Sequence, residues 1–274
     1  THLTGRYITI PVYPLSFDEY QRHHRAQGTT DSTDQLFSRY MMFGGMPGLF
    51  VTGQPDQDRA TEILTSIYES IVMKDVAGRY GIPDIATLEK LSRYLFSTSG
   101  NLFSVNNVAN TLASAGANAS YAPVDNQISA LERSFIVYSA QQERMRGKEL
   151  LRPRRKFYPV DNGFRNLATG FNGSDRGAQL EGIVFMELQR RGYDVAIGSL
   201  PDGEIDFIAK RGNDKQYIQV TLNMTEEQTR ERELAPLRRL GDAFPRTVLT
   251  LDWHSEGMTD EGIHITNVMD WLCS

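Results

Sequence analysis

The sequence has one cysteine, Cys273, among its 274 residues. Without a second thiol the chain forms no internal disulfide and no cysteine-based metal site, which fits a reducing cytoplasm. No apolar run approaches the ~20 residues that a transmembrane helix needs. Residues 1–13 lack the order of charged, apolar and small residues that is typical of a signal peptide. We therefore expect a cytoplasmic protein that does not bind membranes.

An excess of positive charge is also missing. The chain has 29 Lys and Arg against 34 Asp and Glu, a formal net charge of -5. This balance gives no overall attraction to phosphate, so any nucleic-acid binding depends on a local basic patch. The length is sufficient for two domains of ordinary size, and 40% hydrophobic residues are ordinary for a globular protein.

Several common catalytic motifs do not occur. The phosphate-binding pattern GxxxxGK[ST] is absent, so these residues lack the usual ATP site. The "GSD" at 173–175 does not have the pattern of a nucleophile elbow. The adjacent His23 and His24 have no acidic or cysteine companion at the spacing of metal ligands. These absences exclude a serine hydrolase and a histidine-based zinc site on motif grounds.

The N-terminal part of the sequence is mostly helical in pattern. "RYITIPVY" (6–13) predicts a strand. Apolar residues at helical spacing predict helices over 34–53 and 55–80, and "GIP" (81–83) ends the second of them. The Gly/Pro-rich "FGGMPGLF" (43–50) predicts a tight turn between these helices.

The middle of the sequence predicts three helices followed by strands. Ser104 is a suitable N-cap for the second helix, and Pro123 stands at the predicted first position of the third. A strand over "FIVYSA" (135–140), a basic loop and a second strand complete the order of a winged helix-turn-helix. The three predicted helices cover 85–97, 103–116 and 122–134.

From Asp161 onward, helix and strand patterns alternate. This order predicts a layered α/β structure, and the whole chain is therefore expected to be an α+β multi-domain protein. The predicted elements are a helix over 174–192, strands over 193–199, 204–210 and 216–222, a helix over 225–244, a strand over 246–252 and a strand-to-helix segment over 262–273.

Short segments with characteristic residues follow one another along nearly the whole chain: "TGRYITIPVYPLSFDEY" (4–20), "FGGMPG" (43–48), "MKDV" (73–76), "FYPVDNGFRN" (157–166), "LEGIVFMELQRRGYDV" (180–195), "GEIDFIA" (203–209), "YIQV" (217–220) and "REREL" (230–234). In this order they resemble the C-terminal region of bacterial P-loop ATPases of the AAA class. In that family an ATPase domain is followed by a helical region, a winged helix and a domain of unknown function related to the PD-(D/E)XK nuclease frame.

The resemblance implies a domain organisation and an additional ATPase domain in the intact protein. An ATPase domain that binds ATP is expected to precede Thr1 in the intact protein. Arg6, in "TGRY", resembles an arginine that senses the γ-phosphate of a nucleotide; the alternative is an arginine that faces solvent. The implied domains are the end of the ATPase domain (1–20), a helical connector (21–83), a winged helix (84–160) and a nuclease-like α/β domain (161–274).

The nuclease-like site falls on Glu181, Asp206 and Gln219. Nucleases of this frame carry an aspartate on one strand and Glu-x-Lys on the next, and their carboxylates hold Mg²⁺ while the lysine stabilises developing charge. Here Gln219 and Thr221 stand at the Glu and Lys positions. Loss of one such stabilising group costs about 3–4 kcal/mol in the barrier. The site is therefore expected to be degenerate.

The sequence is also compatible with an active nuclease. Glu181 and Asp206 retain enough carboxylate to bind Mg²⁺ or Mn²⁺ weakly, and Arg230 or Arg232 is a candidate replacement for the missing lysine. In the opposite interpretation Glu204, Asp206 and Gln219 form the polar rim of an α/β fold, and the Arg-Glu-Arg-Glu run (230–233) makes ion pairs on the helix surface.

The basic loop of the winged helix is the candidate DNA-binding element. Its cations are expected to contact backbone phosphates without reading sequence, since Asp125 and Glu132 on the recognition helix oppose DNA. The alternative is a protein-interaction module. The candidate phosphate contacts are Arg152, Arg154, Arg155 and Lys156.

The combined prediction is a non-catalytic, partner- or DNA-binding region of an AAA-class ATPase with a degenerate nuclease-like domain. It contacts its own ATPase domain and needs no cofactor of its own. One alternative is a weak Mg²⁺- or Mn²⁺-dependent DNA nuclease. Another is a structural oligomerisation arm of the ATPase.

Overall fold

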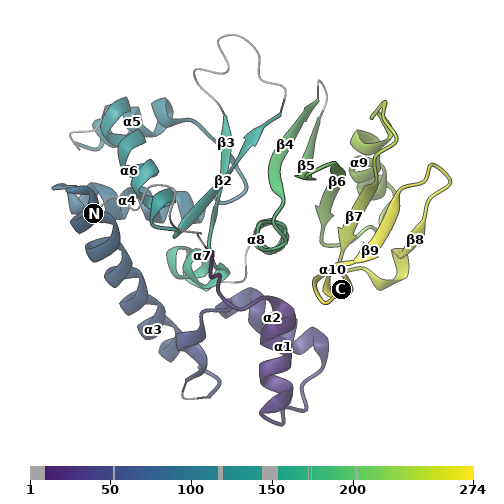
Figure 1. Cartoon of the computed structure of the whole chain (residues 1–274), viewed down its shortest axis with the longest axis horizontal. Coiled ribbons are helices and arrows are strands. Elements are labelled where there is room, and N and C mark those ends of the chain that lie inside the picture. The colour runs from purple at the N-terminus through teal and green to yellow at the C-terminus, as the bar shows by residue number, and fades with distance from the viewer. Residues whose placement is uncertain are drawn as a thin grey trace.

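A computed structural model describes residues 10–51, 53–116, 120–143, 154–171, 173, 175–200 and 203–274. In this part of the chain the fold is α+β, with helices packed around one mixed sheet (Figure 1). None of its helices is both long and apolar enough to cross a membrane.

The strands are β1 (Leu102–Phe103), β2 (Val137–Gln142), β3 (Arg155–Pro159), β4 (Asp194–Leu200), β5 (Gly203–Arg211), β6 (Asp214–Thr221), β7 (Arg246–Thr250), β8 (Gly257–Met258) and β9 (His264–Asn267). The α-helices are α1 (Phe17–Ala26), α2 (Thr33–Phe43), α3 (Gln57–Ser70), α4 (Ile85–Ser97), α5 (Val105–Ser114), α6 (Tyr121–Arg133), α7 (Asn162–Thr169), α8 (Arg176–Arg190), α9 (Glu227–Arg238) and α10 (Val268–Leu272). The remaining turns are the 3-10 segments η1 (Pro47–Phe50) and η4 (Trp253–Ser255) and the π-helical segment η2 (Ile71–Gly78), into which α3 continues.

The described strands form a single nine-stranded sheet in the order β1-β3-β2-β4-β5-β6-β7-β9-β8. β1 and β2 pair antiparallel with β3, and β4, β5 and β6 form an antiparallel meander. β6, β7 and β9 are parallel. β2 pairs parallel with β4 through Gln141 opposite Ala196 and Gln142 opposite Ile197. The sheet therefore continues across the predicted domain boundary at residue 160.

Helices cover both faces of the C-terminal part of the sheet. Phe207 of β5 packs in the hydrophobic cluster that contains Phe185 of α8. The next residue, Ile208, packs in a second cluster with Leu234 of α9. Because neighbouring strand residues point to opposite faces, α8 and α9 lie on opposite sides of β5.

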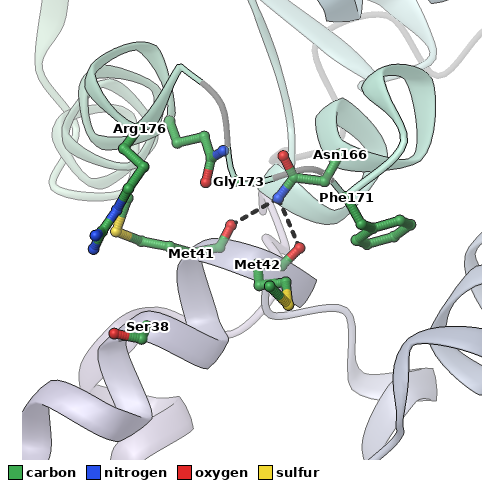
Figure 2. Close-up of a pocket in the computed structure, with 8 residues that line it drawn as sticks. Ser38, Met41, Met42, Asn166, Phe171, Gly173 and Arg176 are labelled. Atoms are coloured by element: carbon green, nitrogen blue, oxygen red, sulfur yellow. Dashed lines mark hydrogen bonds between the residues drawn. The ribbon is translucent and has the colours of Figure 1, made fainter.

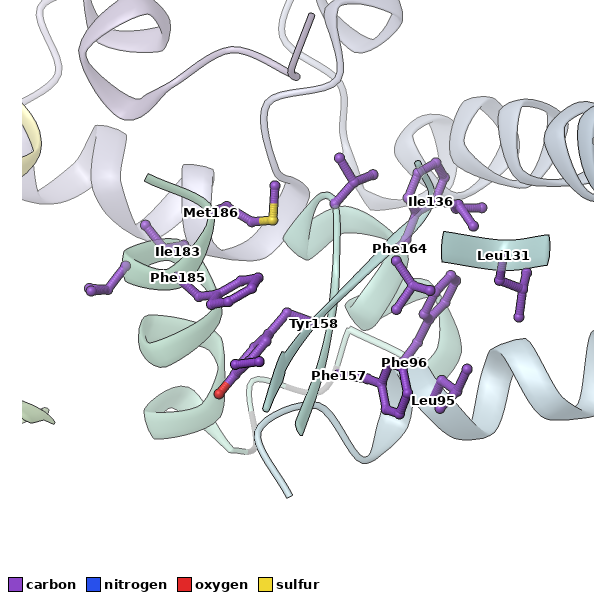
Figure 3. Close-up of a cluster of buried hydrophobic side chains, with 14 of the residues drawn as sticks. Leu95, Phe96, Leu131, Ile136, Phe157, Tyr158, Phe164, Ile183, Phe185 and Met186 are labelled. Atoms are coloured by element: carbon purple, nitrogen blue, oxygen red, sulfur yellow. The ribbon is translucent and has the colours of Figure 1, made fainter. Parts of the chain in front are cut away.

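β3 has the same two-sided burial. Figure 3 shows Phe157 beside Leu95 and Phe96 of α4, whereas Tyr158 faces α8. The Tyr158 ring stacks on Phe185 with 4.2 Å between ring centroids. β3 thus lies in the core between the α4 side and the α8 side of the molecule.

The sequence-based elements agree with the structure in several places. α4 covers the predicted 85–97, and Ser104 accepts a hydrogen bond from the Asn107 N–H at the start of α5. α6 begins at Tyr121, one residue before the predicted range, so that Pro123 lies inside its first turn, where no intrahelical N–H bond is needed. The helix predicted over 34–53 ends at Phe43, because Gly44 leaves the helical conformation there.

Other elements differ from the prediction. Residues 10–13 of the predicted strand 6–13 are not in a strand, and residues 1–9 lie outside the described part. α1 and α7 were not predicted. Their signals are caps rather than long apolar patterns: Ser16 and Glu19 form a capping box on α1, and Asp161 caps α7.

Two of the characteristic segments pack directly on each other. The Asp161 carboxylate accepts hydrogen bonds from the N–H of Gly45 (2.7 Å) and of Gly163 (2.8 Å). Gly44 has φ +78°, and a Cβ built there would lie 1.7 Å from Asp161 Oδ1. The backbone after α2 therefore passes so close to the Asp161 carboxylate that only a residue without a side chain fits at Gly44.

Candidate functional site

Asp206 lies where β5 departs from regular pairing. Between β4 and β5 the register shifts, with Ala196 opposite Ile208 but Gly198 opposite Ile205. Such a bulge re-aims side chains and is common next to active sites. Asp206 Oδ2 accepts a hydrogen bond from the Val220 N–H of β6 at 2.8 Å. The carboxyl group is thereby held between the two strands.

Glu181, from α8, lies against β3 rather than in open solvent. Its Oε1 accepts hydrogen bonds from the Tyr158 hydroxyl (2.7 Å) and from the Lys156 ammonium (3.1 Å). A Cβ built on Gly100, which follows α4, would lie 3.2 Å from Glu181 Oε2. One side of the Glu181 carboxylate is therefore covered by the turn that follows α4.

Lys156 is the cation of this site. It is 4% exposed, and its ammonium contacts both Glu181 and Glu204. Burial alone lowers the pKa of a lysine, but the charges of Glu181, Glu204 and Asp206 outweigh it, so the pKa of Lys156 is raised. Lys156 therefore stays positively charged. We refer to Lys156, Glu181, Glu204 and Asp206 as the carboxylate cluster.

Two carboxyl groups of the cluster, those of Glu181 and Asp206, have raised pKa values. Burial and then the Glu181 charge raise the pKa of Asp206 well above its usual value, although Lys156 opposes this. Burial also raises the pKa of Glu181, again against the effect of Lys156. The cluster thus has more negative groups than its one ammonium balances, and burial strengthens their mutual repulsion.

Gln219 is engaged on the α9 side. Its Oε1 accepts the Asp206 N–H at 3.3 Å, and its Nε2 donates to Glu233 of α9 at 3.0 Å. Thr221 is buried and donates to the Asn223 carbonyl oxygen. The two residues at the Glu-x-Lys positions therefore contact neighbouring backbone and α9.

These residues do not fit a divalent metal ion as they are arranged. Mg²⁺ prefers carboxylate oxygens together with several waters, but Glu181 Oε1 already accepts two hydrogen bonds, one of them from a cation. Among the described residues, no group of three or more His, Cys, Asp or Glu side chains is arranged to hold a metal ion. Of the expected Mg²⁺ or Mn²⁺ ligands, Glu181 is paired with Lys156, and Asp206 accepts the Val220 N–H.

The arginines considered as replacements for the lysine lie elsewhere. Arg232 has a side chain that is 72% exposed, and it pairs with Glu233. Arg230 is on the same helix and is partly exposed. Lys156, which comes from β3 and not from α9, supplies the positive charge next to Glu181.

The four predicted phosphate contacts have different surroundings. Lys156 is buried in the carboxylate cluster and is not available to DNA, which corrects its assignment to the basic surface. Arg155 pairs with Asp125 and Glu132 of α6. Arg154 is exposed at the start of β3. Arg152, like Arg6, lies outside the described residues.

Sequence reasoning missed Lys156, Tyr158 and Glu233 as neighbours of the site. A usable signal exists in "RKFYP": strand alternation places Lys156 and Tyr158 on one face and Arg155 and Phe157 on the other. The run of cations before Lys156 instead favoured the interpretation that Lys156 is exposed to solvent.

A second concave region lies between α2, α7 and α8. It is a cavity of about 340 Å³ whose lining includes Met41, Met42, Phe171 and Arg176. Figure 2 shows the Asn166 side chain donating to the carbonyl oxygens of Met41 and Met42, which ties α7 to the end of α2. None of the carboxylate-cluster residues lines this cavity.

Comparison with known proteins gives a family but no activity. The chain is 35% identical over 272 residues to an uncharacterized protein of Haemophilus influenzae, covering 99% of this chain and 66% of that protein. It is 26% identical over 245 residues to the uncharacterized protein MJ1544 of Methanocaldococcus jannaschii, covering 85% of this chain and 54% of that protein. No solved structure matches. Residues 34–175, just over half of the chain, match the family described as "Domain of unknown function (DUF8612)", and the chain therefore belongs to that family.

Proposed function

We propose that this chain is a non-catalytic binding region of a longer AAA-class ATPase. The observation that carries the proposal is the position of Lys156, whose ammonium lies 3.1 Å from Glu181. With the cation of the site supplied internally, and with Gln219 and Thr221 at the Glu-x-Lys positions, the site lacks the metal-activated water and the free lysine that cleavage requires.

The order of elements supports the two proposed parts. α4, β1, α5, α6, β2 and β3 follow one another with β3 between β1 and β2, as in a winged helix. α8, β4, β5, β6, α9 and β7 follow with helices on opposite faces of the meander, as in the nuclease frame. The chain spans 66% and 54% of its two relatives, which leaves room in those proteins for the proposed ATPase domain and its ATP.

The proposal predicts that the chain does not cut DNA. Incubation with supercoiled plasmid and single-stranded DNA in Mg²⁺ or Mn²⁺ is expected to give no nicked or shortened product above a no-protein control. The matched variant is Asp206→Asn, whose amide oxygen still accepts the Val220 N–H. Nicking by the wild-type chain that is absent from Asp206→Asn would replace this function with a metal-dependent nuclease.

DNA contact is a second candidate for the binding partner, and the exposure of Arg154 at the start of β3 favours it. Arg155 is not a suitable contact because Asp125 and Glu132 already pair with it. Contact would therefore come from Arg154 together with Arg152, through phosphates and with strong salt dependence.

We expect the double variant Arg152→Glu/Arg154→Glu to elute from heparin at lower salt than the wild type. Its DNA affinity should show a log–log salt slope smaller by about 1 for each phosphate that an arginine no longer neutralises. The control is Arg22→Glu/Arg59→Glu, which makes the same charge change at exposed arginines of α1 and α3. Equal elution of the two double variants would eliminate this DNA-binding surface and leave a protein as the partner.

A further inference from the structure

We infer that two adjoining cavities beside α2 form a binding site for a small organic anion that has an apolar body. The first is the cavity of about 340 Å³ between α2, α7 and α8, which we call the methionine cavity. The second, of about 370 Å³, is called the strand-end cavity. Ser38 and Arg176 line both cavities, and none of the carboxylate-cluster residues lines either. A ligand here would therefore go beyond the proposed function.

The strand-end cavity lies at the carboxyl ends of parallel strands. Leu222 directly follows β6, Leu251 directly follows β7, and Met269 follows β9 in α10. β6, β7 and β9 are parallel to one another. Ser38 of α2 and Arg176 at the start of α8 belong to the same lining. Ligands of open α/β sheets bind outside the carboxyl ends of the strands, so the fold places this cavity where such proteins hold ligands.

The methionine cavity has an apolar lining and a wall that is fixed by hydrogen bonds. Its apolar side chains are Met41, Met42 and Phe171. Asn166 donates to the carbonyl oxygens of Met41 (2.9 Å) and Met42 (2.7 Å), and Asn162 on the same helix donates to a carbonyl oxygen of α8 at 3.1 Å. These bonds tie α2, α7 and α8 together around the cavity. A preformed cavity of this kind suits the apolar part of a small molecule, and thioether sulfur favours an aromatic one.

Arg176 supplies a free positive charge where the two cavities meet. Figure 2 shows it on α8, with Ser38 on α2, around the methionine cavity. Arg176 is exposed and has neither an ion pair nor a hydrogen bond with the residues that the structure describes. The Asp175 carboxylate pairs with Arg165 at 3.1 Å and does not cap α8. The first N–H groups of α8 therefore add to the positive potential at Arg176.

The charges of the lining decide how such a ligand is oriented. A guanidinium group binds a planar anion such as a carboxylate through two parallel N–H groups. Asp34 lines the strand-end cavity, and its carboxylate would repel an anion placed deep in that cavity. The anionic group of the ligand is therefore placed beside Arg176 and Ser38, and its apolar body extends into the methionine cavity.

The test uses three probes that separate the apolar body from the charge. Naphthalenesulfonate carries both, naphthalenemethanol carries the ring system alone, and inorganic sulfate carries the charge alone. Isothermal titration calorimetry of the chain at constant ionic strength is expected to show one saturable site for naphthalenesulfonate. Its Kd should be lower than that of either other probe by about tenfold or more, because it alone uses both the apolar lining and Arg176.

Two variants locate the site. Arg176→Gln keeps a polar side chain without the charge, and it should weaken naphthalenesulfonate binding about tenfold without changing the binding of naphthalenemethanol. Ser38→Trp fills the junction of the two cavities and should abolish binding of both probes. The matched controls Arg22→Gln and Ser66→Trp make the same changes at exposed positions of α1 and α3, and both should bind as the wild type does.

The inference is overturned if the wild type shows no saturable binding of naphthalenesulfonate, or if it binds naphthalenemethanol equally tightly. Equal weakening in Arg176→Gln and Arg22→Gln would also overturn it, because the attraction would then be general and not local. If the melting temperature shows that Ser38→Trp is unfolded, the comparison of the two arginine variants decides. The plasmid assay does not depend on these cavities, so nicking by the wild type would replace the non-catalytic function and leave this site standing.

Discussion

Replacing Gly44 with alanine is expected to lower the free energy of unfolding by about 4 kcal/mol. Two effects add. Gly44 has φ +78° and ψ -165°, a region that is almost restricted to glycine. The new Cβ would also lie 1.7 Å from Asp161 Oδ1, and Asp161 cannot move away without releasing the Gly45 and Gly163 N–H groups.

The measurement is urea unfolding of Gly44→Ala beside Gly28→Ala. Gly28 also has a positive φ, +82°, but a Cβ there would meet nothing within 4 Å. Gly28→Ala therefore reports backbone strain alone, about 1 kcal/mol. A loss in Gly44→Ala no greater than in Gly28→Ala would show that the contact with Asp161 has no energetic importance.

The free energy of unfolding is expected to fall as the pH rises from about 4 to about 6. Burial raises the pKa of Asp161 to about 6, although the Gly45 and Gly163 N–H groups oppose this. The folded chain then holds a proton that the unfolded chain, with an ordinary pKa near 3.9, has already released. Raising the pH therefore favours unfolding, by about 3 kcal/mol for about two pKa units, and the loss is complete above pH ~6.

Asp161→Asn isolates this contribution from the other buried carboxyl groups. Burial raises the pKa of Glu181 and Asp206 as well, so the wild type and the variant both carry the slope that those groups cause. The variant should lose about 3 kcal/mol less than the wild type between pH ~4 and ~6 in parallel urea titrations. Identical pH profiles would mean that Asp161 does not titrate in this range in the folded chain.

Local patterns were sufficient for most helices and strands of the C-terminal two thirds. α4 has the predicted bounds because Leu88, Leu91 and Leu95 repeat at helical spacing and Asp84 caps the helix. Patterns failed for α1 and α7, which are short and depend on caps, and for residues 10–13, where strand-forming residues have no neighbouring strand in the described part. A strand needs a partner, and a partner is not visible in local sequence.

The candidate site was predictable only in part. Asp206 and Gln219 lie on neighbouring strands as their hairpin pattern indicates. Lys156 was assigned to a DNA-binding surface because six other cations lie within the twelve residues before it. Its partner Glu181 is 25 residues away along the chain. No periodicity in the sequence reports a contact of that kind.

Composition, caps and periodicity were enough to specify an α+β chain, the positions of most of its elements and the residue types available for chemistry. The pairing of β2 with β4 and the burial of Lys156 came from long-range packing. The physical reason is that local propensities act over a few residues. A buried charge is placed by the strands and helices that converge on it from distant parts of the chain, and its electrostatic role exists only after they have met.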